Sequence, residues 1–138
     1  MTRFISDPSE ETIRSFMREW VSLLAAGRVD DAYAWLYRSD GFTARNILEW
    51  IYQYSPKYRA NPKRAAPPVI NDPASVDPAG ERFYIDQMEI PDENGNTYYG
   101  AQYWIPLDGV WSGMRASFDV VKVGEGQYGM ELTDISVS

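Results

Sequence analysis

The chain has 138 residues, 44% of them hydrophobic, which is enough to bury the core of one domain of ordinary size. It contains no cysteine and no histidine, which excludes disulfides, thiolate catalysis, histidine-based catalysis and the commonest zinc ligands. The net charge is −7 and is divided unevenly, since ten Lys and Arg against eight Asp and Glu give +2 in residues 1–64, while three against twelve give −9 in residues 65–138.

This acidic second half argues against nucleic acid as a partner, because phosphate contacts need Lys and Arg. It is compatible with a basic protein partner, and equally with charge that only keeps the protein soluble. The first residues lack the apolar run of a signal peptide, and no stretch is long and apolar enough to span a membrane. We therefore expect a soluble, cytoplasmic protein that does not bind membranes.

Three helices are predicted in a layer over residues 7–55. Asp7 is predicted to cap the first helix, with Pro8 at its first position, and Gly27 is predicted to end it. A second helix is expected over residues 29–37, and a third from the cap Thr43 to residues 55–56, where Ser-Pro stops it. The first helix has an apolar stripe at three- and four-residue spacing, made of Ile13, Phe16, Met17, Trp20, Val21 and Leu24.

Residues 56–80 contain six of the nine prolines, so neither a long helix nor a central strand is expected there. Residues 81–138 then alternate apolar and polar side chains in four runs, which predicts an antiparallel meander. The alternation slips by one residue near residues 86–87 and again near 133–134, and both slips indicate β-bulges. The fold class predicted is α+β: one domain, residues 1–138, with helices packed on a curved four-stranded antiparallel sheet.

Two motifs have simple structural interpretations. Gly124, Gly126 and Gly129 match G-x-G-x-x-G, but a strand follows where the dinucleotide motif needs a helix, so we interpret them as a hairpin turn. Residues 92–96 are rich in oxygen ligands yet lack the spacing of a calcium loop, so we interpret them as a hairpin tip. We expect no cofactor and no metal.

The carboxylates and aromatic residues leave two hypotheses open. Asp119 and Asp134 are the strand carboxylates that could face the helices and serve acid–base chemistry or a ligand. The aromatic side chains could line a ligand cavity or could simply fill the core. The residues of this possible cavity are Trp20, Trp35, Tyr103, Phe118, Asp119 and Asp134.

The order of elements resembles the NTF2-like (cystatin-like α+β) superfamily. Residues 16–33, FMREWVSLLAAGRVDDAY, look like its opening of a long helix, a Gly-containing break and an Ala-Tyr helix. Residues 129–137, GMELTDISV, look like the last strand of small bacterial members. The resemblance implies a cone-shaped curved sheet, and it places the chain among isomerases, dehydratases, ligand-binding domains and immunity proteins that neutralise bacterial toxins. The chain departs from the enzymes in having no histidine.

Our leading hypothesis is a non-enzymatic protein-binding domain, most concretely an immunity-type protein that binds a basic toxin through an acidic surface. The alternative is a small-ligand-binding protein, or an enzyme without histidine, that uses an aromatic-lined cavity with a buried carboxylate. A homodimerisation module is a third possibility. We assign no catalytic residue. The partner-binding residues expected under the leading hypothesis are Asp86, Glu89, Asp92, Glu93, Asp108 and Glu125.

Overall fold

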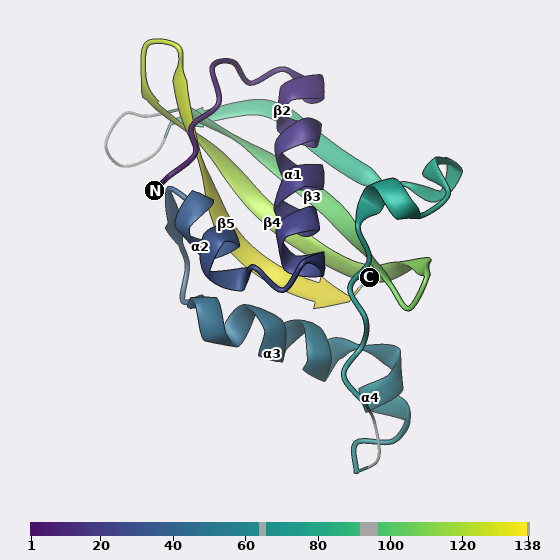
Figure 1. Cartoon of the computed structure of the whole chain (residues 1–138). Coiled ribbons are helices and arrows are strands. Elements are labelled where there is room, and N and C mark those ends of the chain that lie inside the picture. The colour runs from purple at the N-terminus through teal and green to yellow at the C-terminus, as the bar shows by residue number, and fades with distance from the viewer. Residues whose placement is uncertain (64–65, 92–96, 138) are drawn as a thin grey trace.

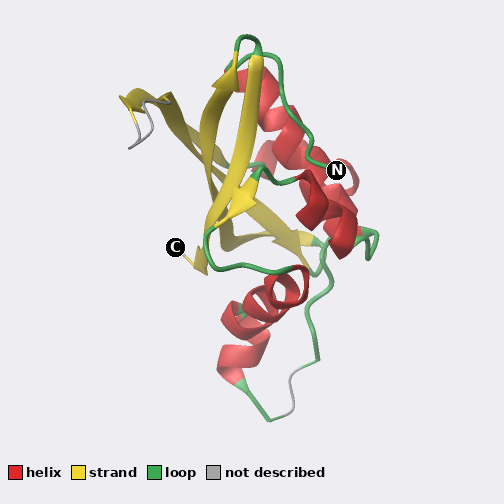
Figure 2. Ribbon diagram, turned by 90° about the vertical axis from the view of Figure 1, so that its left-hand side faces the viewer, coloured by secondary structure: helices red, strands yellow, loops and turns green. Residues whose placement is uncertain are grey.

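A five-stranded sheet with helices on one of its faces makes up the protein, as the computed structural model shows for residues 1–63, 66–91 and 97–137 (Figures 1 and 2). The strand order is β1-β5-β4-β3-β2, with β1 parallel to β5 and the other pairs antiparallel. The helices are α1 (Glu10–Ala25), α2 (Val29–Trp35), α3 (Ala44–Tyr54) and α4 (Pro56–Ala60), with 3₁₀ turns η1 (Pro73–Ser75) and η2 (Pro78–Gly80). The strands are β1 (Arg38–Ser39), β2 (Phe83–Pro91), β3 (Thr97–Leu107), β4 (Val110–Gly124) and β5 (Gln127–Val137).

Helix α1 buries the predicted apolar stripe but begins later than its sequence suggests. Ser9 is the N-cap, and its hydroxyl accepts a hydrogen bond from the Thr12 backbone N–H at 3.3 Å. The prediction of Asp7 as the cap was wrong, because its carboxylate instead accepts from the Ser9 N–H at 2.9 Å. Gly27 ends the helix region at φ 77°, a backbone conformation that glycine adopts without strain.

The segment after α2 corrects the predicted sheet. Helix α2 ends at Trp35 rather than at residue 37, because Leu36 takes an extended conformation. The backbone N–H of Tyr37 then donates to Met130 and that of Asp40 to Leu132, at 2.8 and 2.9 Å. These bonds lay β1 beside β5 as a parallel fifth strand, so the sheet is mixed rather than four-stranded and antiparallel.

Helix α3 and the proline-rich connection follow the prediction. Thr43 caps α3 in a capping box with Asn46. Ser55 ends α3 and also caps the short α4, accepting from the Tyr58 N–H. The connection contains only short helical turns in its described part, and it is tied to the sheet where Ile70 bridges Leu107.

Both predicted bulges are present, but the cone is not. The register of β2 and β3 shifts between Asp86 and Ile90, and in β5 Thr133 is an extra residue opposite β4. Between them, β3 and β4 pair without interruption over seven consecutive β3 residues, from residue 98 to residue 104. This regular centre keeps the sheet from closing or curling strongly, so the expected cone was wrong (Figure 2).

The core lies between α1 and the inner face of the sheet. Trp20 is fully buried, packs edge-on against Phe118 at a centroid distance of 5.2 Å, and donates from its indole N–H to the Ala32 carbonyl at 2.9 Å. Because the indole N–H is paired, burying this large ring leaves no polar group unsatisfied. Tyr99 is partly buried. The alternate residues of β3 and β4 beside it are buried here: Ala101, Tyr103, Ile105, Leu107, Met114, Ala116, Phe118 and Val120.

Candidate functional site

The outer face of the sheet carries a row of charged residues. In the described part of the chain, α1 and α2 lie on the opposite side of the sheet (Figure 2). Gly100 of β3 stands directly opposite Asp86 of β2 on one side and Asp119 of β4 on the other. Asp119 in turn stands opposite Glu131 of β5. Alternation points these side chains outward, because the next residues along each strand, such as Phe118, are in the core.

The row contains a hollow of about 240 Å³ at Gly100, where β3 has only a hydrogen atom in place of a side chain. A Cβ added at Gly100 would meet nothing closer than the Asp86 Cβ, at 3.8 Å, so the space above this glycine is open. The ring of Tyr84, with 57% of the residue exposed, lies at the rim. The residues that line the hollow are Tyr84, Asp86, Gly100, Ala101, Gln102, Ser117, Phe118, Asp119 and Thr133.

The surroundings of Asp119 disfavour the ionised form of its carboxyl group. Burial raises the pKa of its carboxyl group above the ordinary value, and the negative charge of Glu131 raises it further, while Arg38 opposes both effects. Arg38 is itself held in an ion pair with Glu131. Within the described residues, the Asp119 carboxylate has no hydrogen-bond or ion-pair partner. It is therefore an acceptor group available to a ligand.

The structure separates the carboxylates that the sequence grouped as a partner-binding surface. Asp86 lies in the hollow. Asp108 lies in the turn after β3, where its carboxylate accepts from the Val69 N–H at 3.0 Å and pairs with Lys57. Glu125 is fully exposed at the turn between β4 and β5. Glu89 is on β2, but its side chain, like Asp92 and Glu93, lies outside the described residues.

The residues expected to line an internal cavity are placed on two sides of the sheet. Trp20, Tyr103 and Phe118 are buried in the core. Trp35 packs against the core, with its ring centroid 5.7 Å from that of Phe16. The two carboxylates of this set do not join them. Asp119 lies in the outer hollow, and Asp134, opposite Ser117, is exposed.

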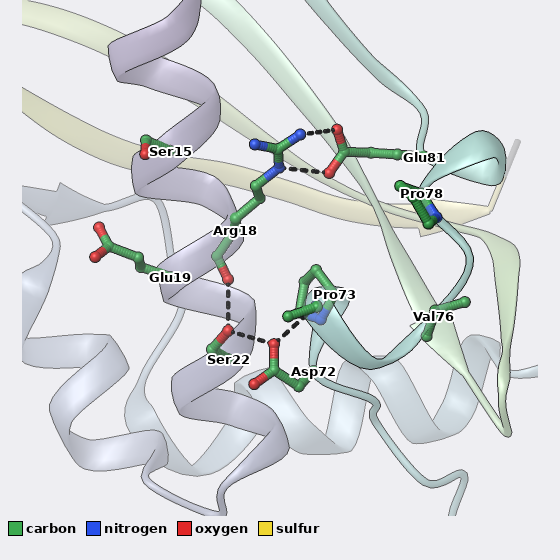
Figure 3. A pocket seen from close by; sticks show the side chains of 10 residues that line it. Ser15, Arg18, Glu19, Ser22, Asp72, Pro73, Val76, Pro78 and Glu81 are labelled. Atoms are coloured by element: carbon green, nitrogen blue, oxygen red, sulfur yellow. Dashed lines mark hydrogen bonds and ion pairs between the residues drawn. The ribbon is translucent and has the colours of Figure 1, made fainter.

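A second pocket, of about 400 Å³, lies between α1 and the segment that carries η1 and η2 (Figure 3). At one end, the Ser22 hydroxyl donates to Asp72 at 2.9 Å. At the other end, Arg18 binds the Glu81 carboxylate through two hydrogen bonds, and the buried Tyr103 hydroxyl donates to the same carboxylate at 2.9 Å. Sequence reasoning missed this site, although Arg18 lies off the apolar stripe of α1.

The charges around Glu81 offset its burial. Burial alone would raise the pKa of Glu81, but the hydrogen bonds from Arg18 and Tyr103, together with the charges of Arg18 and Arg14, hold it below the ordinary value. Burial and the neighbouring carboxylate raise the pKa of Tyr103 far above the ordinary value. Both groups are therefore fixed in one protonation state near neutrality, which suits a structural contact better than proton transfer.

Neither site offers a metal centre, since no three Asp or Glu residues come close enough to hold an ion in the part of the chain that the structure describes. None of the described helices combines the length and apolarity that crossing a bilayer requires. The chain matches no family model, no curated protein and no solved structure in comparisons with known proteins. What the fold and the two sites define is therefore an α+β domain with a hollow lined by carboxylates on the sheet face away from α1 and α2, and a pocket beside α1.

Proposed function

We propose that this protein is a non-enzymatic protein-binding domain that recognises a basic protein through the face of its sheet that lies away from α1 and α2. The observation that carries the proposal is the Asp119 carboxylate, which has no partner among the described residues and lies beside Asp86 in an open hollow. A carboxylate held this way is stabilised when a cation approaches, so charge complementarity favours a basic surface over a neutral one.

The charge distribution along the chain supports the same partner class. Twelve acidic against three basic residues fall after residue 64, and this part of the chain contains β2 to β5. A field of one sign accelerates the encounter with an oppositely charged protein and makes the association sensitive to salt. The resemblance to NTF2-like immunity proteins makes the proposal concrete: the partner is a basic toxin that the domain neutralises.

Co-expression with the product of the adjacent gene tests this function. We expect a complex that forms at low salt, weakens at high salt, and weakens again in the double variant Asp86→Asn, Asp119→Asn. The matched control is Asp30→Asn with Glu49→Gln, which removes the same charge from the helical layer. If the product of the adjacent gene is basic and no salt-sensitive complex forms, or if both double variants bind equally, the proposal fails.

The pocket beside α1 favours a second candidate, a small-ligand-binding protein. Its volume of about 400 Å³ is within the usual range for ligand sites, roughly 300–1,000 Å³. Its walls combine the apolar Pro73, Val76 and Pro78 with the polar Ser22 and Asp72 (Figure 3). A thermal-shift screen of small polar metabolites tests it: a ligand that raises the melting temperature of the wild type, but not of Val76→Trp, supports the candidate, and no hit at all contradicts it.

A further inference from the structure

The geometry of the hollow at Gly100 restricts what can occupy it. Asp86 and Asp119 are on strands separated by β3, so two interstrand spacings, roughly 9–10 Å, lie between their backbones. The residue between them contributes no side chain. Both carboxylates therefore border a gap in which one group can contact each of them, with the backbone of β3 as the floor.

We propose that this hollow receives the guanidinium group of an arginine side chain from the basic partner, held between Asp86 and Asp119. This inference rests on the proposed function and names the contact at its centre. A guanidinium is planar and has five N–H donors in a fixed arrangement, so one group can hydrogen-bond carboxylates on two sides at once. An ammonium is a compact point charge and spans such a gap less well.

Tyr84 provides an independent reason to expect arginine. Its ring is exposed at the rim of the hollow, on the same strand as Asp86 and two residues before it. Guanidinium groups and their aliphatic stems pack on aromatic faces more readily than ammonium groups do. The hollow thus combines an exposed tyrosine among its lining residues, a carboxylate that has no partner within the described part of the chain, and no side chain at Gly100.

The energetics of Asp119 explain why such a contact would dominate the interface. Glu131 stands directly opposite Asp119 across the strand pair, and like charges in this position repel. The charge of Arg38 partly offsets this repulsion, while the Arg38 side chain forms an ion pair with Glu131. A cation inserted at Gly100 relieves this repulsion, and interface energy tends to concentrate in a few such desolvated positions.

Titration of the protein with short peptides, followed by two-dimensional ¹H–¹⁵N NMR, tests the proposal. The probe is N-acetyl-Gly-Arg-Gly-amide, and its matched controls contain citrulline, which is uncharged and has nearly the same shape, or lysine. We expect saturable shifts of the Gly100 amide and its strand neighbours with the arginine peptide, none with citrulline, and roughly tenfold weaker binding with lysine. Equal binding of all three peptides, or no shift around Gly100, overturns the proposal.

Filling the hollow provides the second arm. Gly100→Val adds a side chain where only the Asp86 Cβ lies within 4 Å, at 3.8 Å, so we expect the variant to fold. We expect Gly100→Val and Asp119→Asn to weaken the arginine peptide roughly tenfold or more, and the charge-matched control Glu49→Gln to leave it unchanged. Gly100→Ala fills less of the space and keeps the test valid if the valine variant unfolds. Binding by Gly100→Ala and Asp119→Asn at wild-type strength overturns the proposal.

The two proposals fail in different ways. If a basic protein binds in a salt-sensitive manner but Gly100→Val binds it as well as the wild type does, the arginine contact is wrong and the proposed function stands. If no such protein binds while the arginine peptide still shifts the Gly100 amide, the hollow is a guanidinium site and the proposed function is wrong.

Discussion

Arg18 of α1 and Glu81, directly before β2, form a two-point ion pair that fastens the helical layer to the start of the meander. The Arg18 Nε lies 2.6 Å from the Glu81 Oε2, and Nη2 lies 2.5 Å from Oε1. The hydroxyl of Tyr103, a residue buried in the core, donates a hydrogen bond to the same carboxylate. The Arg14 Nε lies 3.9 Å from the Glu81 Oε1. One carboxylate thus joins α1, β3 and the end of the proline-rich connection.

Replacing Glu81 with Gln should destabilise the fold by about 1–3 kcal/mol. The Glu81 side chain is only 10% exposed, so its removal leaves Arg18 and the Tyr103 hydroxyl without their charged partner. Arg18 is 42% exposed and can turn to water, which keeps the loss below that of a fully buried pair. Urea unfolding measures it, with Glu19→Gln as the control, since the pair of Glu19 with Arg3 is exposed and should contribute about 0.5 kcal/mol or less. Equal losses in the two variants would contradict this role of Glu81.

The same contact should give the protein a recognisable response to acid. The pKa of Glu81 in the fold lies below its ordinary value of 4.5, so its contribution is complete above that value and is lost as the pH falls through the folded pKa. Glutamine does not titrate. We therefore expect the difference in unfolding free energy between the wild type and Glu81→Gln to be constant from neutral pH down to about pH 5 and to shrink below about pH 4. Urea midpoints measured across this range check it, and a difference that stays constant into acid would count against the contact.

Local patterns explain why much of the fold is predictable from the sequence. Helical periodicity specifies the buried face of α1, and the slips in alternation specify the bulges at residues 86–90 and 133, because these features depend on near neighbours in the chain. Turn chemistry likewise specifies the hairpin at Gly126. The sequence did not determine which residue caps α1, because Asp7 and Ser9 are both good caps and lie two residues apart. Only the path of the backbone decides between them.

Contacts between distant segments were not predictable in the same way. Strand β1 is two residues long, and the residues on either side of it, Tyr37 and Asp40, donate the backbone hydrogen bonds that hold it against β5. Arg18 and Glu81 are separated by 63 positions, and nothing local indicates that they meet. The sequence marked both Asp86 and Asp119 as candidates, but for different sites, and only the strand register places them on the two sides of one glycine.

Two glycines on the outer face should respond oppositely to alanine. A Cβ at Gly129 would lie 2.5 Å from the Tyr37 Cβ and 2.6 Å from its Cγ, because the Tyr37 side chain packs directly against this glycine. Gly129→Ala should therefore cost about 1–3 kcal/mol by overpacking. At Gly100 the nearest contact is 3.8 Å, so Gly100→Ala should be neutral or stabilising by about 0.5–1 kcal/mol, since alanine loses less conformational freedom on folding. Thermal or urea unfolding of the two variants decides, and similar effects at both positions would show that the outer face is not hollow at Gly100.

Asp119→Asn should stabilise the isolated protein at neutral pH while weakening its binding to a cation. The pKa of Asp119 in the fold is raised above its ordinary value of 3.8, so the ionised form costs stability above the folded pKa, and that cost disappears as acid protonates the group. Relief of the repulsion from Glu131 should make the variant more stable by about 0.2–1 kcal/mol at pH 7. This gain should diminish on acidification and should be smaller in high salt. Acid thus removes a cost at Asp119, whereas it removes a stabilising contact at Glu81.

Unfolding curves at neutral and acid pH measure the stability of Asp119→Asn, with Glu49→Gln as a control that loses up to about 0.5 kcal/mol of helix pairing with Arg45. A loss of stability at pH 7 in Asp119→Asn would mean that the carboxylate already has a partner that holds it in the free protein.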